Sequence, residues 1–149
     1  MCNFIMVNPG PREQEPETVS VGKKLRVLVV DDEPAVRDVV ADAIQYGGHE
    51  IVGTAKDGTE AIARAQELRP DLVVMDILMP GLNGLDAMKA ILAAKTAKRV
   101  LLMSGEYRSV GVTRDEMMRH GAAGFMEKPF NITELFGLLE HWAGDGRAR

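Results

Sequence analysis

Short apolar runs alternate along this chain with segments in which apolar residues recur every three or four positions. The apolar runs predict five strands, at Leu25–Val30, Glu50–Thr54, Leu72–Asp76, Arg99–Met103 and Gly124–Glu127. The helical pattern predicts five helices, at Ala35–Tyr46, Thr59–Leu68, Leu85–Ala94, Thr113–His120 and Ile132–Trp142. The order of these elements predicts five βα units.

Some of the predicted strands are apolar on both faces, as in Val27–Val30 and Val100–Met103. Such strands belong in the middle of a parallel sheet that helices cover on both sides, with right-handed crossovers. The chain therefore predicts a doubly wound (βα)5 α/β fold. A disordered leader at residues 1–23, which is rich in Pro, Glu and Asn, would precede this domain at 24–143, and residues 144–149 would form a C-terminal tail.

Polar residues follow the apolar runs at the ends of four predicted strands. Asp31 and Asp32 follow the first strand, Asp76 closes the third, and Ser104 and Lys128 follow the fourth and fifth. Ligands of open parallel sheets bind beyond the carboxyl ends of the strands. We therefore expect these side chains to meet in one functional site.

The acids at 31–33 have two interpretations. They precede Pro34, a favoured first helical residue, so they could simply cap a helix, a contribution of about 1 kcal/mol. One acid would suffice for that role, and two carboxylates about 5 Å apart repel by roughly 3 kcal/mol at an effective dielectric constant near 20. A cation would offset this repulsion, and Mg²⁺ suits carboxylates in a solvated cleft, whereas zinc prefers His and Cys.

Lys128 and Ser104 are each ambiguous alone. A lysine is usually a surface residue, and a serine at a strand end often forms a turn. At the end of a buried strand and before Pro129, however, the Lys128 ammonium is well placed to bind a phosphate. It is the joint occurrence of these residues that favours a site.

These motifs together resemble the receiver domain of two-component response regulators, such as the chemotaxis response regulator. The resemblance runs from about Lys24 to Trp142, and it rests on four motifs that each follow a predicted strand. The motifs are Asp31-Asp32, Asp76 with Met79-Pro80 and Gly84, Ser104-Gly105, and Lys128-Pro129-Phe130. The resemblance implies a flavodoxin-like sheet with strand order 2-1-3-4-5.

The resemblance also implies roles for the residues of the acidic site. Asp76 would accept a phosphoryl group from a histidine kinase or a histidine phosphotransferase. Asp31, Asp32 and Asp76 would hold Mg²⁺ together with the backbone carbonyl of Leu78, and Lys128 would pair with the phosphoryl oxygens.

Further residues would carry the signal to other proteins. Ser104 would turn towards the phosphoryl group, and Phe125 would act as the switch aromatic, by rotation of its ring. Ala35, Pro129 and Phe130 would help to dock a partner. A downstream protein target would bind the face formed by the fourth helix, the fifth strand and the fifth helix. The large apolar residues of this face are Met117, Met118, Phe136 and Trp142, although core packing is the commoner fate of such residues.

Two local features are also expected. The Lys128–Pro129 bond is predicted to be cis, because the chain must turn sharply after the fifth strand while Lys128 points inwards, and because the resemblance implies a cis bond here. The fourth helix is predicted to be short, because residues 105–112 have poor helix character ahead of a capping box at Thr113 and Glu116.

Other functions share parts of this pattern. A flavodoxin-like cofactor binder would have the same fold, but its first loop needs hydroxyl and glycine donors, where this chain has Asp31-Asp32-Glu33. An aspartyl-phosphate phosphatase would place a second acid two residues after Asp76, where this chain has Leu78. A receiver-like interaction module that is never phosphorylated is a third alternative. We expect no enzymatic activity beyond the domain's own phosphoryl transfer and dephosphorylation.

The composition of the chain bears on its binding partners and its cellular location. With 149 residues the chain can bury a core of its own, and its net charge of -4, without a basic stripe, argues against direct nucleic-acid binding. Cys2 is the only cysteine, which fits a reducing compartment, and no apolar run approaches the roughly 18 residues of a membrane span. These features predict a cytoplasmic protein that does not contact membranes.

The last predicted helix bears on oligomeric state. It carries Glu134 and Glu140 but no lysine or arginine before Arg147, unlike the basic final helix of receivers that dimerise. We therefore expect a monomer or a weak dimer.

Overall fold

A computed structural model describes residues 24–105 and 111–148. Its strands are β1 (Arg26–Val30), β2 (Glu50–Ala55), β3 (Leu72–Asp76), β4 (Arg99–Ser104) and β5 (Gly124–Glu127). Its helices are α1 (Pro34–Tyr46), α2 (Gly58–Leu68), α3 (Gly84–Ala94), α4 (Arg114–Arg119) and α5 (Ile132–Ala148). The predicted disordered leader, residues 1–23, lies outside the described residues.

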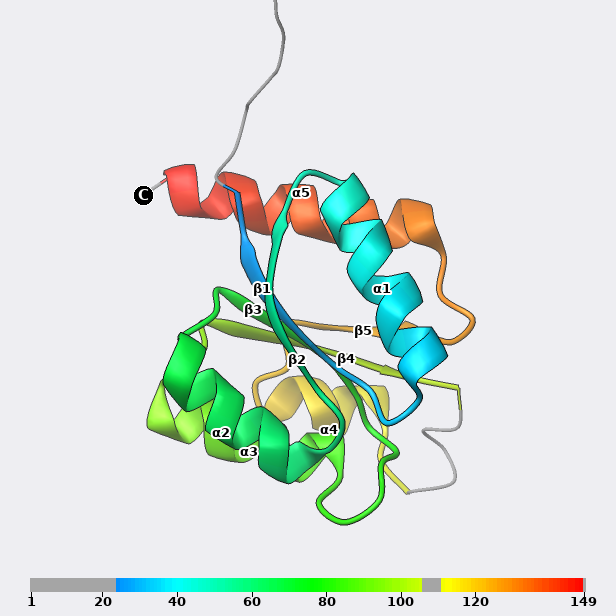
Figure 1. Cartoon of the computed structure of the whole chain (residues 1–149). Coiled ribbons are helices and arrows are strands. Elements are labelled where there is room, and N and C mark those ends of the chain that lie inside the picture. Colours follow the sequence, from blue (N-terminus) through cyan, green and yellow to red (C-terminus); the bar gives the residue numbers. More distant parts are fainter. Residues whose placement is uncertain (1–23, 106–110, 149) are drawn as a thin grey trace, which may run out of the picture.

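The strands form one parallel sheet between two layers of helices. The strand order is β2-β1-β3-β4-β5, and every neighbouring pair is parallel. Helices α1 and α5 cover one face of the sheet, and α2, α3 and α4 cover the other (Figure 1). The predicted flavodoxin-like α/β fold with order 2-1-3-4-5 is therefore confirmed.

The core has one half on each face of the sheet, because successive residues of a strand point to opposite faces. In β1, Val27 and Val29 pack in the half beneath α1 and α5, whereas Leu28 and Val30 pack in the half beneath α2 and α3. All four side chains are fully buried. Full burial of a side chain of this kind contributes roughly 1.5–3 kcal/mol, so both helical layers are needed for a stable sheet.

The predicted elements are all present, with differences only at their ends. Helix α5 continues to Ala148, beyond its predicted end at Trp142. Helix α4 is short, as predicted, and the Thr113 hydroxyl caps it by accepting a hydrogen bond of 3.0 Å from the backbone N–H of Glu116. The part of the preceding loop at residues 106–110 lies outside the described residues.

The strands end in register at one edge of the sheet. Asp76 in β3 pairs with Met103 in β4, and the next residue of β4, Ser104, pairs with Glu127 in β5. The chain leaves β5 through the Lys128–Pro129 peptide bond, which is cis, as predicted. No helix within the described residues is both long enough and apolar enough to cross a bilayer.

The loop after β3 folds back tightly onto the strand. The backbone N–H of Gly84 donates a 2.8 Å hydrogen bond to the carbonyl of Ile77. The backbone N–H of Ile77 in turn donates to the carbonyl of Met103 at 2.9 Å. A Cβ atom at position 84 would overlap the carbonyl oxygen of Asp76 and would lie 2.9 Å from the Ile77 Cα. Position 84 therefore requires glycine to hold the end of β3 in place.

Gly84→Ala should lower the free energy of unfolding by about 1–3 kcal/mol, because the added methyl group meets backbone atoms that cannot move without displacing Asp76. Gly137→Ala in α5 is the matched control, because a Cβ there meets no described atom within 4 Å. The free energy of unfolding of this control should rise by up to about 1 kcal/mol, because alanine favours a helix more than glycine does. Urea denaturation of both variants measures the difference, and equal shifts would contradict the close contact at position 84.

Candidate phosphoacceptor site

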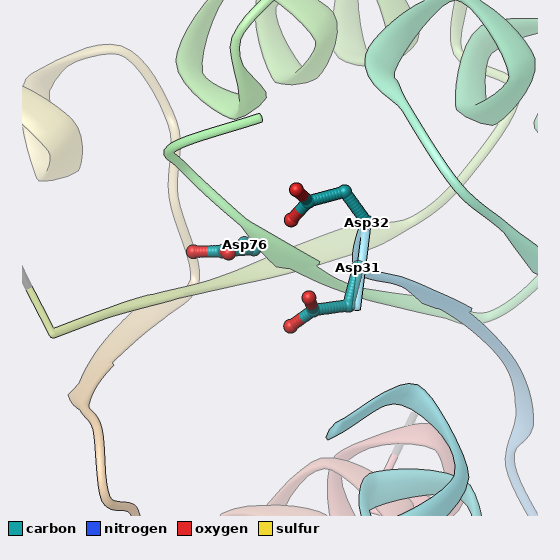
Figure 2. A group of neighbouring side chains, drawn as sticks. All are labelled: Asp31, Asp32 and Asp76. Carbon is teal, nitrogen blue, oxygen red and sulfur yellow. The ribbon is translucent and has the colours of Figure 1, made fainter. Parts of the chain in front are cut away.

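The carboxyl ends of β1 and β3 bring three carboxylates together. Asp31 and Asp32 directly follow β1, and Asp76 is the last residue of β3. One oxygen from each carboxylate lies within 4.8 Å of the others. Figure 2 shows the three side chains turned to the same side of the sheet edge. The predicted convergence of these acids is therefore observed.

The acids border a cleft at this edge of the sheet. Its volume is about 600 Å³, and residues from the ends of β1, β3, β4 and β5 line it. The lining residues are Asp32, Glu33, Asp76, Leu78, Met79, Pro80, Ser104, Gly105 and Lys128. A small anion can thus reach Asp76 from solvent, although the Asp76 side chain itself is only 8% exposed.

Lys128 bonds to two of the three acids. Its ammonium donates hydrogen bonds to Asp31 Oδ2 at 2.8 Å and to Asp76 Oδ2 at 3.1 Å. Its backbone N–H donates to the carbonyl of Ser104 at 3.2 Å, which fixes the end of β5 against β4. Lys128 therefore joins the ends of the outer strands to those of the central ones.

One ammonium does not balance the charge of this cluster. Burial raises the pKa of Asp76, and Asp31 adds to the rise, although Lys128 and the backbone N–H of Leu78 act against it. Burial alone would lower the pKa of Lys128, but Asp31 and Asp76 outweigh it and raise that pKa. A simple ion pair would lower the pKa of its carboxylate. The raised pKa of Asp76 therefore reflects mainly the cost of burying its charge, which the contact with Lys128 offsets only in part.

Helix capping does not account for the acids. The N-cap of α1 is Glu33, and no side-chain capping bond from it is found among the described residues. Asp31 uses Oδ1 to accept from the backbone N–H of Glu33 at 3.0 Å, ahead of the helix. The capping alternative thus explains neither the pair of acids nor their proximity to Asp76. The cluster is consistent with a site for a hard divalent cation.

Comparison with known proteins identifies the family. The profile of the response regulator receiver domain matches residues 27–140. The chain belongs to the response regulator receiver family. It is a CheY-like receiver domain of two-component signalling, and the family implies that a kinase is its partner.

Relatives of this receiver domain differ in their overall length. The chemotaxis protein CheY of Thermotoga maritima is 39% identical over 114 residues, which cover 76% of this chain and 93% of CheY. The protein-glutamate methylesterase/protein-glutamine glutaminase of the same organism is 43% identical over 112 residues, which cover 74% of this chain. Those residues are 32% of that enzyme, so this chain corresponds only to its receiver part.

A solved structure agrees with this assignment. The signal receiver domain of NarL from Mycobacterium tuberculosis superposes with a TM-score of 0.72 and 32% sequence identity. The superposition covers 81% of this chain and 97% of the NarL domain. The similarity thus extends over the whole of that receiver fold.

The receiver domain places Ser104 and Phe125 on neighbouring strands. Ser104 lies at the end of β4, is buried and lines the cleft. Phe125 in β5 pairs with Leu102 of β4, two residues before Ser104, and its ring is buried. Since alternate residues of a strand share a face, both predicted switch side chains lie on the face beneath α4.

A second hollow adjoins the acidic cleft. It has a volume of about 670 Å³ and lies between the start of α1 and the chain that links β5 to α5. Its lining includes all three residues predicted for partner docking, Ala35, Pro129 and Phe130, together with Val36, Val39, Lys128 and Ile132. Lys128 lines both hollows, so the apolar groove opens beside the acidic cleft.

The apolar residues expected on the face of α4, β5 and α5 divide between core and surface. Met117 and Trp142 are buried in the core, whereas Met118 is 45% exposed and Phe136 is partly buried. Phe136 stacks on Tyr46 of α1 with ring centroids 6.3 Å apart, which places it on the side of α5 near α1. Of these four, Met118 is therefore the one that can supply substantial apolar area to a partner on that face.

Sequence reasoning missed two arginines that support the site. Arg37 Nη1 donates to the carbonyl of Asp31 at 2.7 Å, and Arg114 Nη2 donates to the carbonyl of Phe125 at 3.2 Å. Both interactions link a helical side chain to a strand end or strand backbone. Helical periodicity indicates only that such a residue is on a polar face, so the sequence carries no signal for either bond.

Asp76→Asn should stabilise the receiver domain in EDTA at neutral pH and raise its unfolding temperature by roughly 2–8 °C. Because its folded-state pKa is raised, the carboxyl of Asp76 stabilises the fold when protonated. That contribution is lost as the pH rises from the unfolded value through the folded one. The advantage of asparagine should therefore shrink on acidification, which melts at pH 7 and pH 4 measure.

Asp38→Asn is the control for this experiment, because it removes the same charge from an exposed position on α1. It should change the unfolding temperature little at either pH. A variant Asp76→Asn that is less stable than wild type in EDTA would show that the Lys128 contact outweighs the cost of burying the charge of Asp76.

Proposed function

We propose that this receiver is activated when Asp76 accepts a phosphoryl group from a histidine kinase or a histidine phosphotransferase. The observation that carries the proposal is the position of Asp76. Its carboxylate is nearly buried at the end of a central strand, lies in an open cleft and contacts a lysine that can neutralise an incoming anion. Receiver-family membership supports the same role.

The chemistry follows from these groups. An oxygen of the Asp76 carboxylate attacks the phosphorus of a phosphohistidine, the P–N bond breaks, and the imidazole leaves. Negative charge accumulates on the equatorial oxygens of the transferring group. The Lys128 ammonium, within 3.1 Å of Asp76, is placed to neutralise part of it.

Mg²⁺ is the cation that best suits the acidic cluster. The donors are carboxylate oxygens in a solvated cleft, and three carboxylates lie together there with the single ammonium of Lys128. We assign its ligands to Asp31, Asp32, Asp76 and the backbone carbonyl of Leu78. When bound, Mg²⁺ would supply positive charge to the phosphoryl oxygens.

Phosphorylation would act through charge. An acyl phosphate on Asp76 adds nearly two negative charges and strong acceptor oxygens beside Ser104. A turn of the Ser104 hydroxyl towards these oxygens would change the space next to Phe125. Ser104 and Phe125 would thereby alter the face of α4, β5 and α5 that contacts a downstream protein.

The apolar groove would dock the phosphodonor. It opens directly beside the acidic cleft, so a helix seated on Ala35, Val39 and Ile132 could present a phosphohistidine to Asp76. Val39 and Ile132 are 57% and 48% exposed, which leaves apolar area for a partner to bury. Lys128 lines both the groove and the cleft, which connects docking to chemistry.

Acetyl phosphate should add one phosphoryl group to the wild-type chain in the presence of Mg²⁺ and none in EDTA, because the acidic cluster repels an anionic donor until a cation binds. Intact-mass measurement follows the reaction. Asp76→Asn should not be labelled, and the control Asp38→Asn should be labelled like wild type. Labelling of Asp76→Asn, or labelling that survives EDTA, would contradict the assignment. A complete lack of labelling would favour the alternative of an interaction module that is never phosphorylated.

Val39→Glu should slow phosphoryl transfer from a histidine kinase by about tenfold or more, because a charge in the apolar groove opposes docking. Its labelling by acetyl phosphate should be unchanged, since a small donor needs no docking surface. Met118→Glu is the matched control, because Met118 is similarly exposed but lies on α4. It should affect neither reaction. Equal rates of kinase transfer for the two variants would place the docking surface elsewhere.

A further inference from the structure

Arg114 occupies a position that local helix chemistry disfavours. It is the first residue of α4, and a cation in the first turn of a helix opposes the helix dipole. The following acids Asp115 and Glu116, and the Thr113 cap, are the residues that suit this helix start. The reason for an arginine at this position therefore lies in its tertiary contacts.

Arg114 holds Phe125 through two different contacts. Its Nη2 donates a hydrogen bond of 3.2 Å to the backbone carbonyl of Phe125. Its guanidinium carbon also lies 5.4 Å from the centroid of the Phe125 ring, which is the geometry of a cation–π interaction. Arg114 is exposed, whereas the Phe125 ring is 5% exposed, so the guanidinium lies on the solvent side of the ring.

This arrangement connects α4 to the proposed switch. Phe125 pairs with Leu102, and Ser104 follows two residues later on the same face of β4. Outward movement of the ring would expose aromatic surface and would also remove the guanidinium contact. Arg114 therefore favours the buried position of Phe125, next to the strand that carries Ser104.

We propose that Arg114 is a positioning residue that keeps Phe125 buried and α4 fastened to β5, and thereby increases the affinity of the cleft for a phosphoryl group. The proposal rests on the proposed function, in which Ser104 turns towards a phosphoryl group on Asp76 and changes the space next to Phe125. We take this change to favour the buried ring. The phosphoryl group and Arg114 then favour the same conformation. Because coupling between two sites is reciprocal, loss of Arg114 must weaken phosphoryl binding even though Arg114 is not among the residues that line the cleft.

The test measures the affinity of the full chain for beryllium fluoride, a phosphoryl mimic, in the presence of Mg²⁺. Titrations are followed by amide NMR shifts. Arg114→Gln should weaken binding by about fivefold, the size expected for a modest coupling. Arg119→Gln makes the same charge change at an exposed position in the last turn of the same helix, and it should leave the affinity within about twofold of wild type. Equal affinities of the two variants would overturn the proposal.

Two further variants separate positioning from general destabilisation. Arg114→Lys keeps the charge but loses the planar guanidinium, so it should retain only part of the affinity. In a Phe125→Leu background the aromatic ring is absent, and Arg114→Gln should then weaken binding by less than about twofold. A loss of fivefold or more in both backgrounds would show that Arg114 acts without the ring, and would overturn the proposal.

The position of the ring is measured separately, without phosphoryl chemistry. Aromatic NMR signals of Phe125 in Arg114→Gln should broaden more than those of wild type when a soluble paramagnetic reagent is added, because the ring reaches solvent more often. A ring that stays as protected as in wild type would overturn the proposal. If the wild-type chain neither binds beryllium fluoride nor is labelled at Asp76, the proposed function fails. Whether Arg114 keeps the ring of Phe125 buried is then decided by the paramagnetic broadening alone.

Discussion

Repulsion among three carboxylates at one edge of the sheet is the constraint on which the site depends. Carboxylate oxygens of Asp31, Asp32 and Asp76 are held within 4.8 Å of one another because β1 and β3 are neighbouring parallel strands that end in register. Separating the charges would require unpairing those strands, which are buried on both faces. The carboxylates therefore stay close together, and burial, with a smaller contribution from Asp31, raises the pKa of Asp76.

The Lys128 ammonium offsets part of the repulsion among the carboxylates and also shapes the site. Its ammonium bonds to Asp31 and Asp76, so the end of β5 is drawn towards the ends of β1 and β3 across β4. A cation added to the cleft, or an anion added to Asp76, changes the forces on this lysine directly. Lys128 directly follows β5, the strand that carries Phe125, so this lysine connects the acidic cluster to that strand.

The two helical layers give the edge of the sheet different neighbours. On one face, α1 and the chain leading into α5 form an apolar groove beside the acidic cleft. On the other, the short helix α4 is held to β5 by Arg114. The apolar groove and the contact between α4 and β5 therefore lie on opposite faces of a sheet whose strands end at the same cleft (Figure 1).

The sequence by itself determined the order of the elements, the parallel sheet and the acids at its carboxyl edge, because each depends on local periodicity or on residues that adjoin a strand. It did not decide between the alternative roles of individual residues. Capping by the acids at 31–33 and core packing of Met117 were both consistent with the sequence, and only the tertiary structure rejected the first and established the second. The contacts of Lys128 and Arg114 were likewise decided by packing, because a long side chain reaches residues that no local pattern connects to it.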